Sequence, residues 1–144
     1  MKDKYIDEMR AFSRFYTNIL GLLNTHILDS RFSLAEVRIL YELFHHKYYT
    51  SKELIDSLQM DKGQLSRMLL KFEDQNLVVR IRSKTDKRSV LLSLTKKGMK
   101  EFETLNNTSN DQVMHLLMRL EEKNLSELVH HMKEIQKILS VINK

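Results

Sequence analysis

Two helix starts that follow each other closely, at Thr50 and at Asp61, constrain the fold of this chain more than any other feature of its sequence. Thr50 and Glu53 have the spacing of a capping box, in which a hydroxyl and a carboxylate each satisfy a free backbone N–H. Asp61 supplies an N-cap acceptor for a second helix. Two short helices joined by a tight turn are typical of the helix-turn-helix, so the sequence predicts that motif here.

The apolar pattern changes after Asn76 from a period of about 3.6 to a period of about 2, which indicates strands. Val79 and Ile81 alternate with arginines, and Val90, Leu92 and Leu94 form a second alternating run. The loop between them, residues 83–89, is polar, basic and too long for a two-residue turn. The sequence therefore predicts a β-hairpin wing whose loop projects into solvent.

Long amphipathic helices are predicted on both sides of this central motif. Apolar residues recur at spacings of three and four over Tyr5–Ile27 and predict one long helix, and a further capping box begins at Ser33. Thr95 can cap a helix that carries apolar residues as far as Leu120, and another helix follows up to Ile142. The absence of proline and the presence of only three glycines agree with a mainly helical chain.

These patterns predict a single domain over residues 1–144, mainly α with a small β-hairpin wing. A winged helix-turn-helix would occupy residues 33–95, between dimerisation helices at 1–30 and 99–144. The central motif is too small to cover so much apolar surface, so we expect a homodimer to bury it. Because the chain has no cysteine, no signal peptide and no long apolar run, we expect a cytoplasmic protein without disulfides or a membrane span.

Positive charge is concentrated in the middle of the chain. Residues 50–100 hold 12 of the 24 lysines and arginines but only 6 of the 19 acidic residues. This segment therefore carries a charge of +6 and the rest of the chain −1, which together give the net charge of +5. Such asymmetry favours a polyanionic partner, because neutralised phosphates release counterions. The alternative is a solvated basic face.

The second helix of the motif carries polar residues opposite its apolar stripe. Arg67 is a candidate for a bidentate pair with guanine, Gln64 for one with adenine, and Gly63 would permit close approach to DNA. The alternative, solvated surface residues, is weakened by their clustering at one helix N-terminus. A second group is expected to contact phosphates without reading sequence: Ser51, Lys52, Lys62, Ser66 and Lys71.

The basic hairpin loop is a candidate minor-groove probe. Asp86 and Arg88 are two residues apart, so we expect the carboxylate to hold the guanidinium extended toward a narrow, electronegative groove. Lys84 and Lys87 would contact phosphates beside it. The alternative is a surface ion pair of little energetic value.

The order of the elements and the run from Asp86 to Gly98 resemble the MarR (multiple antibiotic resistance regulator) family. That run looks like the family's D-x-R wing followed by L-T-x-x-G, and residues 65–77 look like its recognition helix. The resemblance covers nearly the whole chain, and residues 61–98 are also similar to the regulator half of MarR–acetyltransferase fusions. It implies a homodimer on a pseudo-palindromic operator, often modulated by a small ligand. Sensing of peroxide through cysteine does not carry over, because this chain has no cysteine.

An effector pocket is expected where the first two long helices meet the helix after Thr95. Tyr16, His26, Tyr41 and His45 are candidate lining residues, with aromatic core packing as the alternative. The six histidines show no diagnostic ligand spacing, so no metal site is predicted. The sequence has no phosphate-cradling glycine loop, nucleophile elbow or zinc-protease motif, so no enzyme is predicted.

The sequence therefore predicts a sequence-specific DNA-binding transcriptional regulator, a repressor that binds its operator in double-stranded DNA as a homodimer under small-molecule control. The alternative is a winged-helix interaction or adaptor module that does not read DNA.

Overall fold

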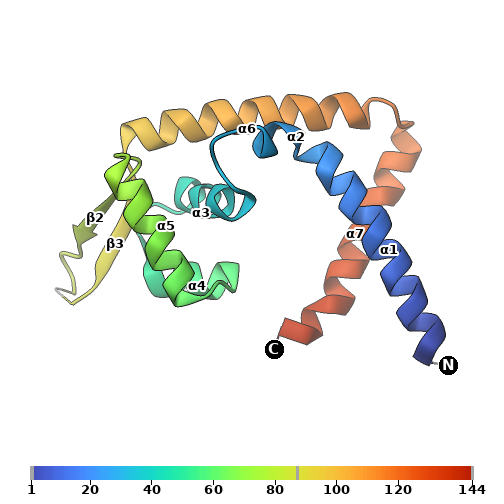
Figure 1. The fold of residues 1–144 in the computed structure, drawn as a ribbon, viewed down its shortest axis with the longest axis horizontal. Coiled ribbons are helices and arrows are strands. Elements are labelled where there is room, and N and C mark those ends of the chain that lie inside the picture. Colours follow the sequence, from blue (N-terminus) through green and yellow to red (C-terminus); the bar gives the residue numbers. More distant parts are fainter. Residues whose placement is uncertain (1, 87, 144) are drawn as a thin grey trace. The chain divides into compact units, whose positions relative to one another are not determined.

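The computed structural model describes residues 2–86 and 88–143, apart from the side chains of His26, Leu28 and Asn143. The chain forms two compact units, Met1–Ser109 and Asn110–Lys144. Figure 1 shows the elements, which in chain order are α1 (Lys2–Leu23), α2 (Thr25–Leu28), α3 (Leu34–His45), β1 (Tyr49–Thr50), α4 (Ser51–Leu58), α5 (Lys62–Asp74), β2 (Val78–Arg82), β3 (Val90–Leu94), α6 (Lys96–Leu117), α7 (Glu122–Leu139) and the 3-10 turn η1 (Ser140–Asn143).

The three predicted helix starts are confirmed. Thr50 Oγ1 accepts a hydrogen bond from the backbone N–H of Glu53 at 3.1 Å, and the Glu53 carboxylate accepts one from the Thr50 N–H at 3.2 Å. Ser33 forms the same reciprocal capping box at the start of α3. Asp61 Oδ2 accepts a hydrogen bond from the N–H of Gln64 at 3.0 Å at the start of α5. Each of these side chains satisfies donors that a helix leaves free at its first turn.

The turn between α4 and α5 is as tight as predicted. Helix α4 ends at Leu58 and α5 begins at Lys62. Gln59 reverses the chain in the left-handed region, at φ 49°, a conformation that non-glycine residues adopt rarely and singly. The buried side chains of both helices, among them Leu54 and Leu65, join one core. The helix-turn-helix is thus confirmed.

The wing is a three-stranded antiparallel sheet in the order β1-β3-β2. The predicted hairpin is β2 paired with β3, with Arg80 opposite Leu92. Strand β1 was not predicted, because two residues are too few to show a period. Leu92 and Leu94 are buried as expected, but Val79 and Ile81 are exposed. Val79 and Ile81 lie on the opposite face of the sheet from Val78 and Arg80, which pair with Leu94 and Leu92.

Gly98 allows the start of α6 to pack closely against the backbone between α5 and β2. A Cβ atom at this position would lie 2.1 Å from the Leu77 carbonyl oxygen, which is backbone and cannot move aside cheaply. Leu77 is fully buried, and its carbonyl accepts a hydrogen bond from the Thr95 N–H at 3.0 Å. Thr95 Oγ1 in turn accepts from the N–H of Gly98 at 3.0 Å and so caps α6 as predicted. The threonine and the glycine therefore join the recognition motif to the long helix α6.

The single helix predicted over Tyr5–Ile27 is interrupted. Helix α1 ends at Leu23, and α2 begins at Thr25. Asn24 has φ −110° and ψ 12°, and its side-chain amide donates to the Leu20 carbonyl at 2.8 Å. Asparagine competes with the helix in this way by bonding to nearby backbone groups. Helix α6 also ends earlier than predicted, at Leu117 instead of Leu120.

The terminal helices expose their apolar stripes. Neither α1 nor α7 has a buried residue among those that the structure describes. Within the first unit, Met9 and Phe12 of α1 are exposed, and within the second, Val129 and Met132 of α7 are exposed. No helix in the described part of the chain is long and apolar enough to cross a membrane.

Candidate nucleic-acid interface

Helix α5 buries one side and leaves the other free. Leu65, Leu69 and Phe72 are at most 1% exposed. Residues three and four positions apart share a helix face, so the side opposite this stripe carries four residues, which we call the outer face of α5: Gly63, Arg67, Leu70 and Asp74. All four residues are exposed.

Gly63 and Arg67 form the N-terminal half of this outer face. A Cβ atom at Gly63 would lie 3.1 Å from Asp61 Oδ2 and 3.7 Å from Arg67 Nη1. The guanidinium therefore lies over the glycine, where it can reach base edges from a helix that itself approaches closely. Lys62 and Ser66 are exposed beside them, as expected for phosphate contacts. Gln64 is half-buried at the flank of the helix.

The remaining predicted phosphate contacts divide into two groups. Ser51 and Lys52 lie at the start of α4, and Lys52 is exposed. Lys71 instead forms an ion pair with the buried carboxylate of Glu36, with Nζ and Oε1 2.7 Å apart. Glu36 also closes the capping box of α3, so this pair joins α3 to α5. Lys71 therefore has a structural role that sequence reasoning missed, because the two residues are far apart in the chain.

The hairpin loop owes its shape to Asp86, but not in the way predicted. The carboxylate accepts a hydrogen bond from the Arg88 backbone N–H at 3.0 Å and another from Ser89 Oγ at 3.0 Å. It was expected to hold the Arg88 guanidinium, and it binds the backbone instead. Short carboxylates favour such turns. Lys84 and Arg88 are exposed in this loop, whereas Lys87 lies outside the described residues.

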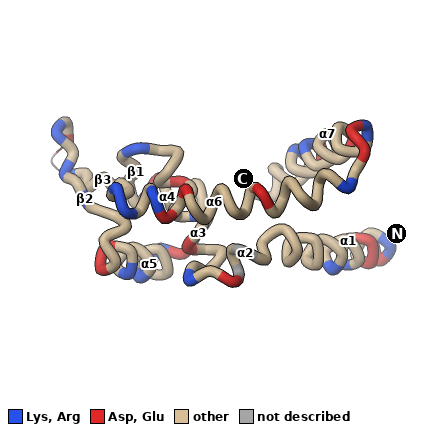
Figure 2. Tube along the Cα trace, turned by 90° about the horizontal axis from the view of Figure 1, so that it is seen from above, with Lys and Arg blue, Asp and Glu red and all other residues tan. Residues whose placement is uncertain are grey.

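Arg82 is a further cation of the wing that sequence reasoning left out. It is exposed at the end of β2, opposite Val90. Its neighbour Arg80 is occupied by an ion pair with Glu73, with Nε and Oε1 2.6 Å apart, whereas no described carboxylate pairs with Arg82. Its place at the end of a strand, next to the basic loop, is the sequence signal that could have identified Arg82. Figure 2 shows the lysines and arginines at the tip of the hairpin and along α5.

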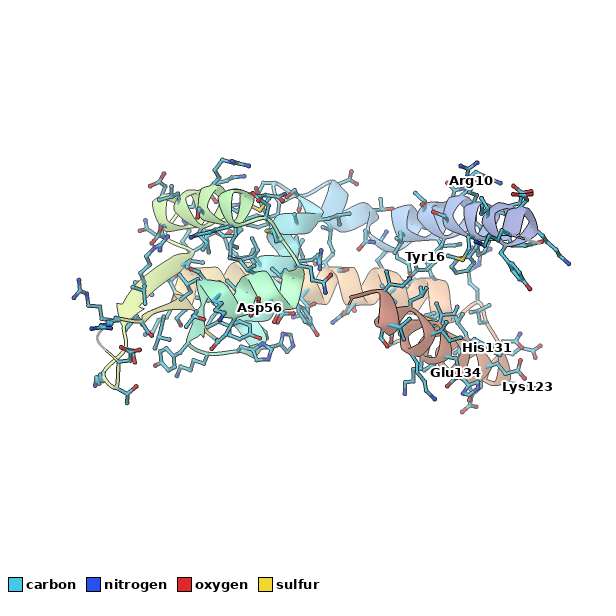
Figure 3. The ribbon with its side chains drawn as sticks, turned by 90° about the horizontal axis from the view of Figure 1, so that it is seen from below. Arg10, Tyr16, Asp56, Lys123, His131 and Glu134 are labelled. Atoms are coloured by element: carbon cyan, nitrogen blue, oxygen red, sulfur yellow. The ribbon has the colours of Figure 1, made fainter. Side chains whose placement is uncertain are left out.

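A hollow of about 370 Å³ lies among α2, α3, α4 and α6, within the first unit. Tyr41, a candidate lining residue, lines this hollow, whereas His45 is not among the described lining residues and its ring lies tilted against that of Tyr41, with centroids 4.1 Å apart. Tyr16 lies on α1 (Figure 3), stacked on Phe12, and is not among the described lining residues. The side chain of His26 lies outside the description. The lining residues are Ile27, Val37, Arg38, Tyr41, Glu42, Ser57, Leu58, Phe102, Leu105, Asn106 and Ser109.

A chain of contacts connects two walls of this hollow through the sheet of the wing. Glu42 lines the hollow on α3, and its carboxylate lies 3.3 Å from His46 Nδ1. The His46 ring stacks on Tyr49 with centroids 4.6 Å apart, and the Tyr49 hydroxyl lies 2.9 Å from Oγ of Ser57 on α4. Tyr49 also pairs with Leu92 of β3. The hollow and the wing therefore share Tyr49 as a common neighbour.

No metal centre is evident among the described residues, where no group of three or more histidine, aspartate or glutamate side chains could hold an ion. His131 and Glu134 lie on α7 (Figure 3), and the ring of His131 contacts that of its neighbour His130 at 5.4 Å between centroids. Asp56 lies on α4 (Figure 3).

Comparison with known proteins gives consistent results. Residues 32–90 match the model of the MarR family. The organic hydroperoxide resistance transcriptional regulator of Bacillus subtilis is 45% identical over 89 residues, which cover 62% of this chain and 56% of the relative. This chain therefore spans little more than half the length of that relative.

Two solved structures share the fold. A variant of MarR from Escherichia coli, crystallised with operator DNA, is 25% identical, with a TM-score of 0.75 over 92% of this chain and 96% of the other. FabT of Streptococcus pneumoniae, in complex with DNA, is 19% identical, with a TM-score of 0.81 over 96% and 99% of the two chains. The segment that matches the family model contains the helix-turn-helix, β2 and the hairpin loop just described, and over this segment the chain is similar to the MarR family.

Proposed function

We propose that this chain is a transcriptional regulator that represses genes by binding an operator in double-stranded DNA as a homodimer in the cytoplasm. Each α5 would lie in a major groove, one helical turn of DNA apart, and each hairpin would reach the flanking minor groove. The matched MarR variant and FabT are DNA complexes by their own description. The two curated relatives of this chain are named as transcriptional regulators.

The observation that carries the proposal is the free outer face of α5 with Arg67 on it and other exposed cations nearby. Arg67 lies over a glycine on that face, while the opposite side of the helix is buried in the core. Lys62 is exposed on the same helix, and Arg82 and Arg88 are exposed on the hairpin of the same unit. Phosphate contacts from such cations position a protein on the duplex, and side chains on the helix read bases.

The proposal is tested by in-vitro selection of DNA with the full chain, followed by titration of the selected duplex at several salt concentrations. We expect a pseudo-palindromic sequence whose affinity falls steeply with salt, because each neutralised phosphate releases counterions. A winged-helix adaptor that does not read DNA would select no sequence. Salt-independent or absent binding to many duplexes would count for that adaptor and against the regulator.

Small-molecule control is proposed at the hollow beside Tyr41. A ligand there would contact Glu42 and Ser57, which Tyr49 and His46 connect to the sheet of the wing. It would thereby favour one position of the wing over another, because a ligand shifts an equilibrium only by its difference in affinity. A thermal-shift screen should find ligands that also weaken DNA binding. Tyr41→Ala should abolish both effects, whereas Tyr48→Ala, outside the hollow, should leave them unchanged.

A further inference from the structure

Leu70 occupies a position that the cations of the interface leave unexplained. It lies on the outer face of α5, one turn after Arg67, and 57% of its surface is exposed. Along α5, all of whose residues the structure describes, it is the one large apolar side chain in this exposed class. It therefore presents an apolar contact on a face that otherwise carries a glycine and two charged residues.

Single exposed leucines are common on protein surfaces and need no special cause. Leu70 differs because its surroundings determine what can approach it. Arg67 precedes it on the outer face and Lys62 lies on the same helix, so a polyanion is attracted to this half of α5. Asp74 follows it on the outer face and would repel phosphates, so DNA contact on this face should end at Leu70.

The dimensions of the major groove allow Gly63, Arg67 and Leu70 to contact DNA together. At about 1.5 Å per residue, Leu70 lies about 10.5 Å along the helix from Gly63 and about 4.5 Å from Arg67. The major groove is about 12 Å wide and admits a helix of about 10–12 Å diameter, so these three residues, which share one face of α5, can all face the base edges. One base-pair step is about 3.4 Å, so Leu70 would lie one or two steps from the base that Arg67 reads.

We propose that Leu70 is a specificity-determining residue that contacts the C5-methyl group of a thymine in the operator. Thymine is the one base that presents a methyl group in the major groove, and apolar side chains are its usual contacts. An apolar side chain has no hydrogen bond to offer the other base edges. The inference rests on the proposed function, since it assumes that α5 lies in the major groove.

The test replaces single thymines of the selected operator with deoxyuridine, which removes the methyl group and leaves every hydrogen-bonding group in place. Titration of the full chain should show one thymine per half-site, one or two base pairs from the guanine read by Arg67, where the change weakens binding about fourfold. The Leu70→Ala variant should bind the thymine and deoxyuridine duplexes equally. Because Leu70 is exposed, this variant should keep the circular dichroism and thermal midpoint of the parent.

Leu34→Ala is the matched control, because Leu34 is also an exposed leucine at 42% but lies at the start of α3. It should keep the full sensitivity to the methyl group. The inference is overturned if the parent binds every deoxyuridine duplex as tightly as the thymine duplex. It is also overturned if the Leu70→Ala variant still binds the thymine duplex more tightly than the deoxyuridine duplex. Either result leaves the selected operator, and with it the regulator, intact. If no duplex is selected at all, the proposed function itself fails, and this inference fails with it.

Discussion

Among single side chains, Arg67 should contribute most to the reading of sequence. Arg67→Ala is expected to cost about 1–3 kcal/mol of binding and to relax the preference at one position per half-site, if the guanidinium pairs with guanine. Arg67→Lys keeps the charge but loses the planar fork, so it should retain non-specific binding and lose the guanine preference. Both expectations are checked by titrating each variant with the selected operator and with an operator in which that guanine is replaced. Unchanged affinity and selectivity in both variants would contradict the assignment.

Gly98 should be required for stability and not for DNA contact. In Gly98→Ala the new methyl group would collide with the Leu77 carbonyl, so we expect a loss of about 1–3 kcal/mol in the free energy of unfolding. Gly21→Ala is the matched control, because nothing lies within 4 Å of a Cβ there. Since alanine is the better helix former, it should stabilise α1 by up to about 1 kcal/mol. Urea denaturation measures both, and equal effects of the two substitutions would refute the steric explanation.

The hairpin should act as one unit in which Asp86 shapes the loop that carries Arg88. Asp86→Ala removes the acceptor for the Arg88 N–H and for Ser89 Oγ. Removing a negative charge beside DNA would by itself tighten binding, whereas loss of the loop shape should weaken it. We expect weaker binding, similar to that of Arg88→Ala and greatest for operators with A·T-rich flanks. Asp86→Asn keeps an acceptor and should bind more tightly than Asp86→Ala. Tighter binding by Asp86→Ala would show that the carboxylate acts only through its charge.

Elements with local signals could be predicted from the sequence. The starts of α3, α4 and α5 depend on an N-cap side chain that accepts a hydrogen bond from the backbone N–H three residues on, as at Thr50 and Glu53, and the hairpin depends on an alternating pattern. What depended on distant partners could not be predicted. The pairing of Lys71 with Glu36 and the existence of β1 are set by tertiary packing. The break at Asn24 reflects competition between a side chain and the helix backbone, which the apolar period does not register.

The candidate site could be predicted as far as it depends on one helix. The outer face of α5 follows from helical periodicity alone, so Gly63 and Arg67 were placed correctly on it. The alternating pattern predicted the hairpin but not which face of β2 packs on the core, and Val79 and Ile81 lie on the exposed face. The partners of Asp86 depend on loop geometry, which sequence spacing does not determine.

For the intact molecule, the exposed stripes of α1 and α7 predict a dimer. Phe12 is 45% exposed on α1, a helix without a described buried residue. If a second copy covers this surface, Phe12→Glu places a charge in an apolar interface, and light scattering at micromolar concentration should show a monomer where the parent is a dimer. Loss of the dimer should also lower the affinity for the operator, because each half-site must then be bound separately.

Leu34→Glu provides the control for this substitution. Leu34 is exposed to a similar degree, 42%, but it lies at the first position of α3, where a carboxylate is favourable near the helix N-terminus. That variant should remain a dimer and bind the operator as the parent does. A monomeric parent would refute the dimer and leave the exposed stripes without a partner. A dimeric Phe12→Glu variant with parental affinity would place the interface away from this face of α1.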